Sequence, residues 1–105
     1  ANILKLVSKG DIPGLEQAVQ EGAEVNFSND STSPLIAAVQ VQNADMVELL
    51  LRSRADANFS TLGSQVAPLH MAAFDGSVEM MKLLLSRGAD VNVRDRHGQT
   101  PLFFA

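Results

Sequence analysis

The hydrophobic and polar positions of residues 67–92 predict two short helices joined by a turn. Pro68 lies where a helix can begin, because the N–H group that proline lacks has no partner in a first helical turn. Asp75 and Gly76 then interrupt the apolar run, and Ser77 is a residue type that caps a following helix. The segment therefore has the pattern of a helix-turn-helix unit.

The second of these expected helices has an apolar face. Met81, Leu84 and Leu85 are spaced i, i+3 and i+4, which places them on one side of a helix and predicts that they pack against the rest of the molecule. Gly88 follows this run, and glycine readily adopts the left-handed conformation that ends many helices. The polar stretch 89–99 comes next and predicts a turn or hairpin loop that leads to another Thr-Pro helix start.

The same pattern recurs along the chain. The segment "SPLIAAVQVQNADMVELLLRSRADAN" at 33–58 aligns with "APLHMAAFDGSVEMMKLLLSRGADVN" at 67–92, at an offset of 34 residues. The string "EGAEVN" closes the same pattern in residues 2–26, and "TPLFFA" opens it again at the end. Two helices of about nine residues cannot bury their apolar faces alone, but stacked neighbours can. We therefore expect three units, at approximately 2–33, 34–67 and 68–100, with residues 101–105 as the start of a fourth.

The stretch "APLHMAAFDGSVEMMKLLLSRGADVNVRDRHGQTPL" resembles the ankyrin repeat, whose pattern is T-P-L-H-x-A-A with a period of about 33 residues. The resemblance covers nearly the whole chain and is clearest in the third unit. It implies an all-α fold, a single domain of residues 1–105 built as a solenoid of stacked helix-turn-helix units with projecting hairpin loops. It also implies a non-catalytic role, because members of this family bind other proteins through the hairpin tips and the concave face of the first helices.

The chain departs from the family pattern at several positions. The Thr and His of that pattern hydrogen-bond to each other and to the adjacent loop, yet no unit keeps both. The residues at these paired positions are Ser33 with Ile36, Ala67 with His70, and Thr100 with Phe103. Ala67 has no side-chain acceptor to cap a helix, which costs about 1 kcal/mol. Arg54 stands where the third unit has Gly88. Positive φ at a non-glycine residue costs about 1 kcal/mol, unless the helix end adjusts instead, and we expect the second unit to be the less stable one.

Composition places the chain among small globular domains. It has 105 residues, of which 46% are apolar and 19% are charged, so it has enough apolar surface to fold into one small domain. Cysteine is absent, which excludes disulfides and thiolate chemistry and fits a reducing compartment. There is no apolar run of about 18 residues and no basic-then-apolar leader, so we expect a cytoplasmic or nuclear location without membrane insertion. Because the chain begins at Ala1 without Met, we expect a processed or excised part of a longer chain.

The net charge of −4 is unevenly distributed, with −5 in residues 1–50 and +1 in residues 51–105. An acidic total disfavours non-specific binding to nucleic acid. Three arginines near the end, Arg87, Arg94 and Arg96, form a local basic group that we interpret as a solvated rim.

Candidate catalytic residues are few. His70 and His97 are the only histidines, and His70 occupies the position of the family's structural histidine. His97 follows Asp95 in "DRH" on an expected loop tip, but the chain has no zinc spacing, P-loop or nucleophile elbow. The acids Asp45, Glu48 and Glu79 are interpreted as exposed helix residues. We therefore expect no enzymatic activity, no cofactor and no metal.

Three tripeptides match the acceptor pattern for N-glycosylation, at Asn26, Asn29 and Asn58. Such tripeptides arise often by chance. Asn26 and Asn58 occupy the repeat position that Asn92 occupies in the third unit, so the repeat itself explains an asparagine there.

The resemblance assigns partner contacts to the variable positions of the family. Along the first helices these positions hold Lys9, Gln40, Val41, Phe74 and Asp75; at the hairpin tips they hold Asn29, Asp30, Leu62, Ser64, Arg96 and His97. Val41, Leu62 and Phe74 are apolar at positions expected to face solvent, and Leu62 lies in the longest hairpin loop, 59–67. If these three side chains converge on one concave strip, they could form the centre of an interface.

The leading hypothesis is a protein–protein interaction module of an intracellular adaptor or scaffold, with a protein partner of unknown identity. The alternative is a regulatory domain that inhibits an enzyme, as a kinase inhibitor does, or that recruits substrates to a ubiquitin ligase. The chain could also be one end of a larger enzyme or channel. The full-length sequence would separate these possibilities.

Overall fold

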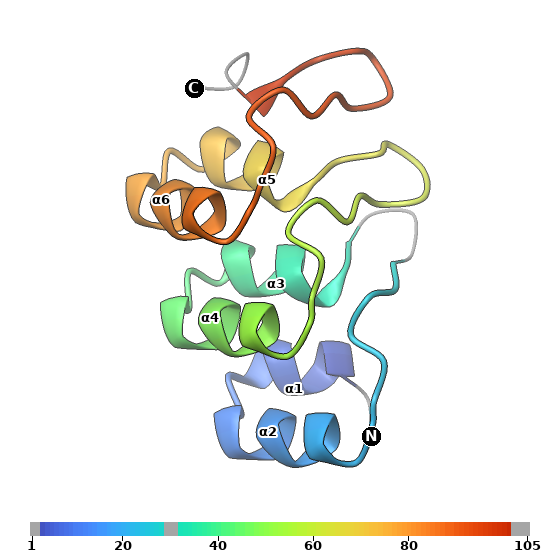
Figure 1. Cartoon of the computed structure of the whole chain (residues 1–105), viewed down its shortest axis with the longest axis vertical. Coiled ribbons are helices and arrows are strands. Elements are labelled where there is room, and N and C mark those ends of the chain that lie inside the picture. The colour runs from blue at the N-terminus through green and yellow to red at the C-terminus, as the bar shows by residue number, and fades with distance from the viewer. Residues whose placement is uncertain (1–2, 29–31, 102–105) are drawn as a thin grey trace.

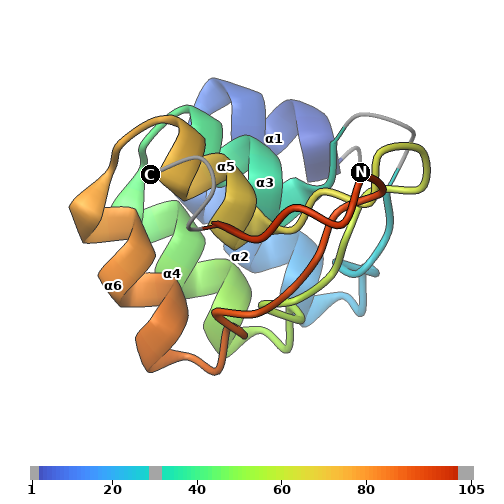
Figure 2. The same cartoon turned by 90° about the horizontal axis from the view of Figure 1, so that it is seen from above.

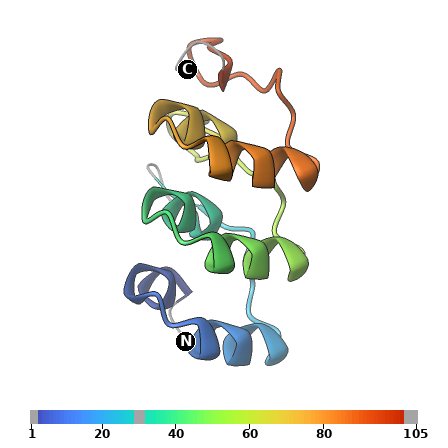
Figure 3. The same cartoon turned by 90° about the vertical axis from the view of Figure 1, so that its left-hand side faces the viewer.

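A computed structural model of the chain describes residues 3–28 and 32–101, and it consists of helix pairs stacked along one axis (Figures 1 and 3). Within these residues there are helices but no strand, and the principal extents are 37 × 26 × 21 Å. The helices are α1 (Ile3–Lys9), α2 (Ile12–Gln20), α3 (Pro34–Gln40), α4 (Ala44–Arg52), α5 (Pro68–Phe74) and α6 (Val78–Ser86). The expected all-α solenoid of helix-turn-helix units is confirmed.

The division into units at 2–33, 34–67 and 68–100 remains our proposal, and each helix pair lies within one of these ranges. The proposed fourth unit, 101–105, and Phe103 with it lie outside the described residues except for Pro101. That residue is buried and helical.

Helices in this chain begin where the sequence places a cap. A side-chain oxygen of each cap residue accepts a hydrogen bond from the backbone N–H three residues later. That N–H group lies in the first turn of the helix and has no partner within the helix itself. These caps are Asp11 to Gly14 at 3.0 Å, Ser33 to Ile36 at 3.2 Å, Asn43 to Met46 at 3.1 Å and Ser77 to Met80 at 3.4 Å. The prediction for Ser77 is confirmed. Ala67, as expected, makes no such bond at the start of α5.

Arg54 adopts the left-handed conformation predicted for it. Its φ is +76°, beside +95° for Gly88 at the equivalent position of the next unit. In both units the N–H group of the following alanine donates to a carbonyl near the end of the outer helix, from Ala55 to Leu50 at 2.9 Å and from Ala89 to Leu84 at 3.0 Å. The two helix ends therefore share this closing hydrogen bond, and only the second unit carries a side chain at the residue with positive φ.

We expect Arg54→Gly to raise the free energy of unfolding by about 0.5–1 kcal/mol, because glycine adopts positive φ without steric cost. Glycine also adds freedom to the unfolded chain, which works against the gain. Urea melts measure the effect. Arg52→Gly, two residues earlier inside α4, is the control and should destabilise by about 1 kcal/mol. A lower urea midpoint for Arg54→Gly than for the parent would contradict the prediction.

The core lies between the inner helices α1, α3 and α5 and the outer helices α2, α4 and α6. Each inner helix contacts the next inner helix, and the outer helices stack in the same way. The largest fully buried apolar side chains are Val7, Leu15, Ile36, Val39, Met46, Val47, Leu50, Met80 and Leu84. They come from all three helix pairs, so the pairs stabilise one another through a continuous core.

The apolar residues of α6 lie on two neighbouring faces, of which one is buried in the core and the other is partly exposed. Leu84 is fully buried, and its partner one turn earlier is Met80, which is 1% exposed. Met81 is only partly buried and Leu85 is 41% exposed. The expectation that Met81 and Leu85 pack with Leu84 is therefore corrected. Two apolar i, i+4 pairs lie side by side on this helix, and the fold buries only one of them.

Two asparagine side chains join successive units. Each side-chain amide nitrogen donates to the carbonyl of the residue with positive φ in the next unit. Each amide oxygen accepts the N–H group of the residue two positions after that one. These bonds are Asn26 to Arg54 (2.9 Å) and Asp56 (2.7 Å), and Asn58 to Gly88 (3.1 Å) and Asp90 (2.7 Å). The amides that a glycan would need are thus used between units, as the repeat pattern suggested. Asn29 lies outside the described residues.

Candidate partner-binding surface

One column of exposed residues runs along the inner helices, where each of them ends. Lys9, Val41 and Asp75 all precede a turn residue with positive φ, which shows that they occupy equivalent positions in the three units. All three are exposed, and so are Gln40 and Phe74, one residue earlier in their units. Phe74 is 69% exposed and Val41 is 51% exposed. We call these five residues the concave strip; the stacked inner helices that carry them appear in Figure 2.

The predicted hairpin residues lie elsewhere. Leu62 is 70% exposed on the loop that precedes α5, whereas Phe74 is the last residue of that helix, so the two residues belong to opposite ends of α5. Figure 1 shows this loop and helix. The structure therefore does not bring Leu62 into one strip with Val41 and Phe74. The predicted tip residues Asn29 and Asp30 lie outside the described residues.

Two neighbouring hairpin loops share one surface. The N–H group of Arg96 donates to the carbonyl of Ser64 at 2.9 Å, which joins the loop before α5 to the loop before Pro101. Arg96 is exposed and Ser64 is half-buried. Leu62 and His97 flank these two residues in the sequence and are exposed. We call Leu62, Ser64, Arg96 and His97 the fingertip cluster.

Internal hydrogen bonds hold the longest loop in place. Thr61 is 2% exposed, and its hydroxyl accepts from the N–H group of Val66 at 3.1 Å and lies 3.2 Å from the Ser64 hydroxyl. A backbone bond of 2.9 Å from Thr61 to the carbonyl of Val66 closes the turn. Leu62 is therefore presented by a bonded turn, which lowers the entropy cost of using it in an interface.

Phe74 borders an apolar groove that sequence reasoning did not identify. Val66, His70, Met71 and Phe74 line a groove of about 190 Å³. The amide of Gln40 approaches the sulfur of Met71 at 3.7 Å, so a polar group of the middle unit contacts one of the residues that line the groove. Met71 lies three residues before Phe74 on the same helix face, which is a signal that could have found it.

His70 makes the structural contacts that its repeat position predicts. It is 1% exposed, its Nδ1 accepts the N–H group of Ala67 at 3.0 Å, and its Nε2 lies 2.8 Å from the carbonyl of Gln99. With Nδ1 as an acceptor, the ring carries its proton on Nε2 and donates it to Gln99. Both ring nitrogens are occupied, so His70 connects α5 to the loop that precedes Pro101.

Asp95 organises that loop. It is 8% exposed, and its carboxylate accepts the N–H groups of His97 and Gln99, both at 2.9 Å. Burial by itself would raise the pKa of Asp95, but the two N–H groups, from Gln99 and His97, and the imidazoles of His70 and His97 together bring it below its ordinary value of 3.8. The sequence "DRH" therefore forms a turn held by a carboxylate.

Acid should weaken this turn. Because the pKa of Asp95 is lowered in the folded chain, its carboxylate stabilises the fold above the unfolded pKa of about 3.9, and this contribution is lost as the pH falls through the folded value. We expect the urea midpoint to fall more between about pH 6 and pH 3 for the parent than for Asp95→Asn, which keeps an oxygen acceptor but does not titrate. Equal losses for the two proteins would count against this role of Asp95.

The remaining charged side chains do not form a chemical site in the described part of the chain. Asp45 and Glu79 are exposed, and Glu48 lies 3.4 Å from Arg87 in a surface ion pair between α4 and the end of α6. Such exposed pairs contribute about 0–1 kcal/mol. No group of three or more histidine, aspartate or glutamate residues among those described could hold a metal ion. None of the described helices is both long and apolar enough to cross a membrane.

Known proteins with similar sequences and structures share one repeat. The family model described as "Ankyrin repeat" matches residues 30–62 and 66–96. A rice protein, "Probable E3 ubiquitin-protein ligase XBOS33" (Oryza sativa subsp. japonica), is 44% identical over 72 residues, which are 68% of this chain and 14% of that protein. The human "Ankyrin repeat and SOCS box protein 6" is 34% identical over 106 residues, covering 98% of this chain and 25% of that protein.

A solved structure matches as well. The crystal structure of the ankyrin repeat domain of Bcl-3, described as a member of the IkappaB protein family, has a TM-score of 0.91 and 28% identity, covering 98% of this chain and 46% of that chain. The present chain thus spans a quarter or less of these two curated relatives and about half of the solved domain.

Proposed function

The chain belongs to the ankyrin repeat family, and from this premise we propose that it is the interaction module of an intracellular adaptor or scaffold, binding a protein partner through the concave strip and the fingertip cluster. Ankyrin repeats are protein–protein interaction modules and are generally non-catalytic. The observation that carries the proposal is Phe74, a large aromatic side chain that is 69% exposed beside an apolar groove.

An interface on this surface would have an apolar centre. Phe74, Met71 and Val66 lie along the groove, and Val41 is exposed at the same end of the neighbouring unit. A partner side chain that enters the groove would cover Phe74, and a few buried aromatic residues supply most of the affinity in protein interfaces. Polar groups of Gln40 and Asp75 border this centre and could set the orientation of the partner.

The exposed basic groups of this chain suggest a second property of the partner, its charge. The first unit carries Lys5 and Lys9 at exposed positions of α1, and the fingertip cluster contains Arg96. Exposed basic groups also occur on the outer helices, at Arg52 and Lys82, but Lys9 and Arg96 lie within the two proposed contact surfaces. We expect the partner to present an apolar side chain flanked by acidic groups, and its association to slow with increasing salt.

Site-specific crosslinking tests the proposal. A photo-crosslinking residue is placed at Val41 on the concave strip or at Val78 on outer helix α6, two valines that are 51% and 57% exposed. We expect a protein from cell extract to crosslink at position 41 and not at position 78. Crosslinking confined to position 78, or absent from position 41, would contradict the concave strip as the binding surface.

The second candidate function is regulation of an enzyme, by inhibition or by delivery of a substrate. Two relatives favour this candidate, the rice protein named as a probable E3 ubiquitin-protein ligase and the human protein named for a SOCS box. The crosslinked partner separates the candidates. Ubiquitin attached to that partner only when the full-length protein is present would support substrate delivery, whereas an enzyme whose activity falls on binding would support inhibition. A partner with neither response would support the adaptor.

The compartment is part of the proposal. The sequence leads us to expect the cytoplasm or the nucleus, and no role in binding nucleic acid. Imaging of the tagged full-length protein tests the location. Staining at the cell surface or in the secretory pathway would contradict it.

A further inference from the structure

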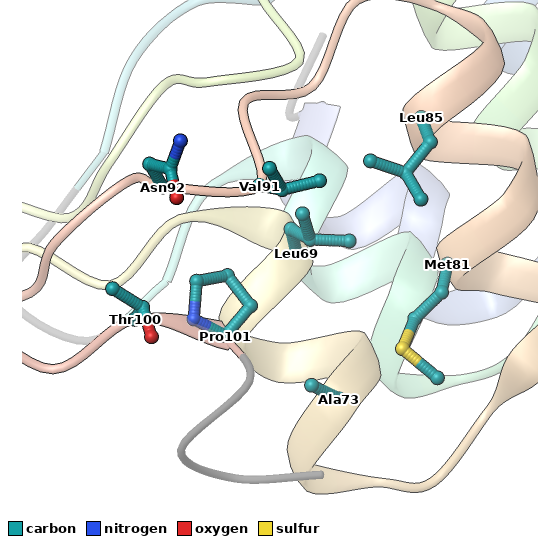
Figure 4. Close-up of a pocket in the computed structure, with 8 residues that line it drawn as sticks. All are labelled: Leu69, Ala73, Met81, Leu85, Val91, Asn92, Thr100 and Pro101. Atoms are coloured by element: carbon teal, nitrogen blue, oxygen red, sulfur yellow. The ribbon is translucent and has the colours of Figure 1, made fainter.

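The segment 89–101 is fixed at both of its ends and projects between them (Figure 1). Its two ends meet at a pocket of about 280 Å³ on the open end face of the stack, beyond α5 and α6 (Figure 4). Residues that line this pocket include Met81, Leu85, Val91, Asn92, Thr100 and Pro101. The Gln99 carbonyl also accepts from His70 at 2.8 Å. The tip, residues 94–98, is therefore carried on a base that packs against both helices.

This tip separates its charges. Asp95 is its one acid; it is 8% exposed, and its carboxylate accepts two backbone N–H groups of the same turn. Arg94, Arg96 and His97 are exposed. The guanidinium of Arg94 donates to the carbonyl of Gly98 at 3.3 Å, which holds this charge beside the tip. The tip therefore keeps its carboxylate within the turn and presents two arginine charges to solvent.

The neighbouring loop widens this surface without adding a negative charge. Residues 59–67 contain no acidic and no basic side chain, and Leu62 is 70% exposed among them. The bond of 2.9 Å from the N–H group of Arg96 to the carbonyl of Ser64 joins the two loops. The other acid of loop 89–99, Asp90, lies near its start, and its carboxylate accepts the N–H group of Asn92 at 2.8 Å. The surface thus combines an exposed leucine with cations.

We interpreted Arg87, Arg94 and Arg96 as one solvated rim, but the structure divides them. Arg87 pairs with Glu48 at 3.4 Å on the outer helices. In the described part of the chain, neither Arg94 nor Arg96 forms an ion pair. Cations left without a carboxylate on a well-held surface attract acidic groups, and arginine can bind a carboxylate through two N–H groups at once.

The concave strip has the opposite charge in the same unit. Asp75 is exposed beside Phe74, at the end of α5 that lies away from the loop 59–67. A carboxylate of the partner would be repelled at that end of α5 and attracted at the fingertip cluster. The charges of the third unit therefore favour one direction of an acidic segment relative to α5.

We propose that the fingertip cluster, together with Arg94, is the binding site for an acidic segment of a protein partner. Carboxylates of this segment bind Arg94 and Arg96, and an apolar side chain next to them contacts Leu62. The inference rests on the proposed function for the existence of a partner. It adds which of the two surfaces binds the acidic groups and what chemistry those groups have.

Titration with a short acidic peptide tests the proposal. The probe is Glu-Glu-Leu-Glu-Glu with both ends blocked, and the readout is the set of backbone amide shifts in NMR spectra. At about 0.01 M salt we expect shifts confined to residues 61–66 and 94–98, and at about 1 M salt, where the screening length falls to about 3 Å, we expect them to vanish. The same peptide with glutamine in place of glutamate should cause no shifts.

Two matched variants locate the charges. Arg94→Gln combined with Arg96→Gln should weaken binding of the acidic peptide about five- to tenfold, as expected for the loss of two exposed ion pairs. Arg52→Gln combined with Lys82→Gln removes the same net charge from exposed positions of the outer helices and should bind like the parent. Arg96→Gln alone leaves the Arg94 bond to Gly98 in place and should give a smaller loss, which tests the site even if the double variant melts early.

The proposal is overturned if the acidic peptide shifts residues outside the two loops, if the glutamine peptide binds equally, or if the control pair weakens binding as much as the fingertip pair. The peptide titration does not depend on the partner crosslinked at position 41. A crosslinked partner with a negative titration overturns this inference alone. A positive titration without any crosslinked protein supports the charge preference of the fingertip cluster and contradicts the proposed function of the concave strip.

Discussion

Leu84→Ala is expected to lower the free energy of unfolding by about 2–5 kcal/mol, the range measured when a large buried side chain is truncated. Leu84 is fully buried in the core that joins the helix pairs. Alanine would leave a cavity there, because surrounding helices relax only in part. Domains of this size are stable by about 5–15 kcal/mol, so the change removes a large share of the total, and urea melts would show it directly.

Leu85→Ala is the matched control, because it changes the same residue type at the next position of α6. Leu85 is 41% exposed on the open end face, and we expect its truncation to cost about 0.5 kcal/mol or less. Met81→Ala should fall between the two, since Met81 is partly buried beside the same pocket. Similar losses for Leu84→Ala and Leu85→Ala would show that the assignment of buried and open faces on α6 is wrong.

Phe74→Ala is expected to weaken binding of the partner about thirtyfold, which is about 2 kcal/mol, because truncating a central aromatic residue has effects of this size. The same change should alter the free energy of unfolding by about 0.5 kcal/mol or less, since the side chain is 69% exposed. The partner crosslinked at position 41 serves as the ligand. Titration calorimetry measures its affinity, and urea melts measure the stability of the variant.

Two further variants define the surface. Val78→Ala truncates an exposed valine on outer helix α6 and should bind like the parent. Leu62→Ser tests the fingertip cluster separately, because the structure places Leu62 at the other end of α5; a loss of binding with an unchanged melt would extend the interface to the hairpins. If Phe74→Ala unfolds the domain, Phe74 is a core residue, and if Val78→Ala weakens binding equally, the partner lies on the outer helices.

Much of this protein follows from local rules that a sequence displays. Pro68 and Ser77 mark helix starts, because a proline ring or a capping hydroxyl suits only the first turn of a helix. The strained φ of Arg54 could be predicted because the other units have glycine at the same position. The repeat spacing gave the stacked architecture, since short amphipathic helices at a constant period can bury their faces only against neighbouring copies.

Only the tertiary structure decided which apolar residues are buried and where the loop residues lie relative to the helices. Met80 and Met81 are both apolar on an amphipathic helix, and periodicity cannot tell which one faces a neighbour and which faces an open end. For a similar reason, the sequence did not show that Leu62 lies apart from the strip that contains Val41 and Phe74. The 59–67 loop is held by hydrogen bonds between residues far apart in the chain, such as Arg96 to Ser64. Leu62 on this loop precedes α5, whereas Phe74 ends that helix. Contacts of this kind come from the packing of whole units and leave no local signature in the sequence.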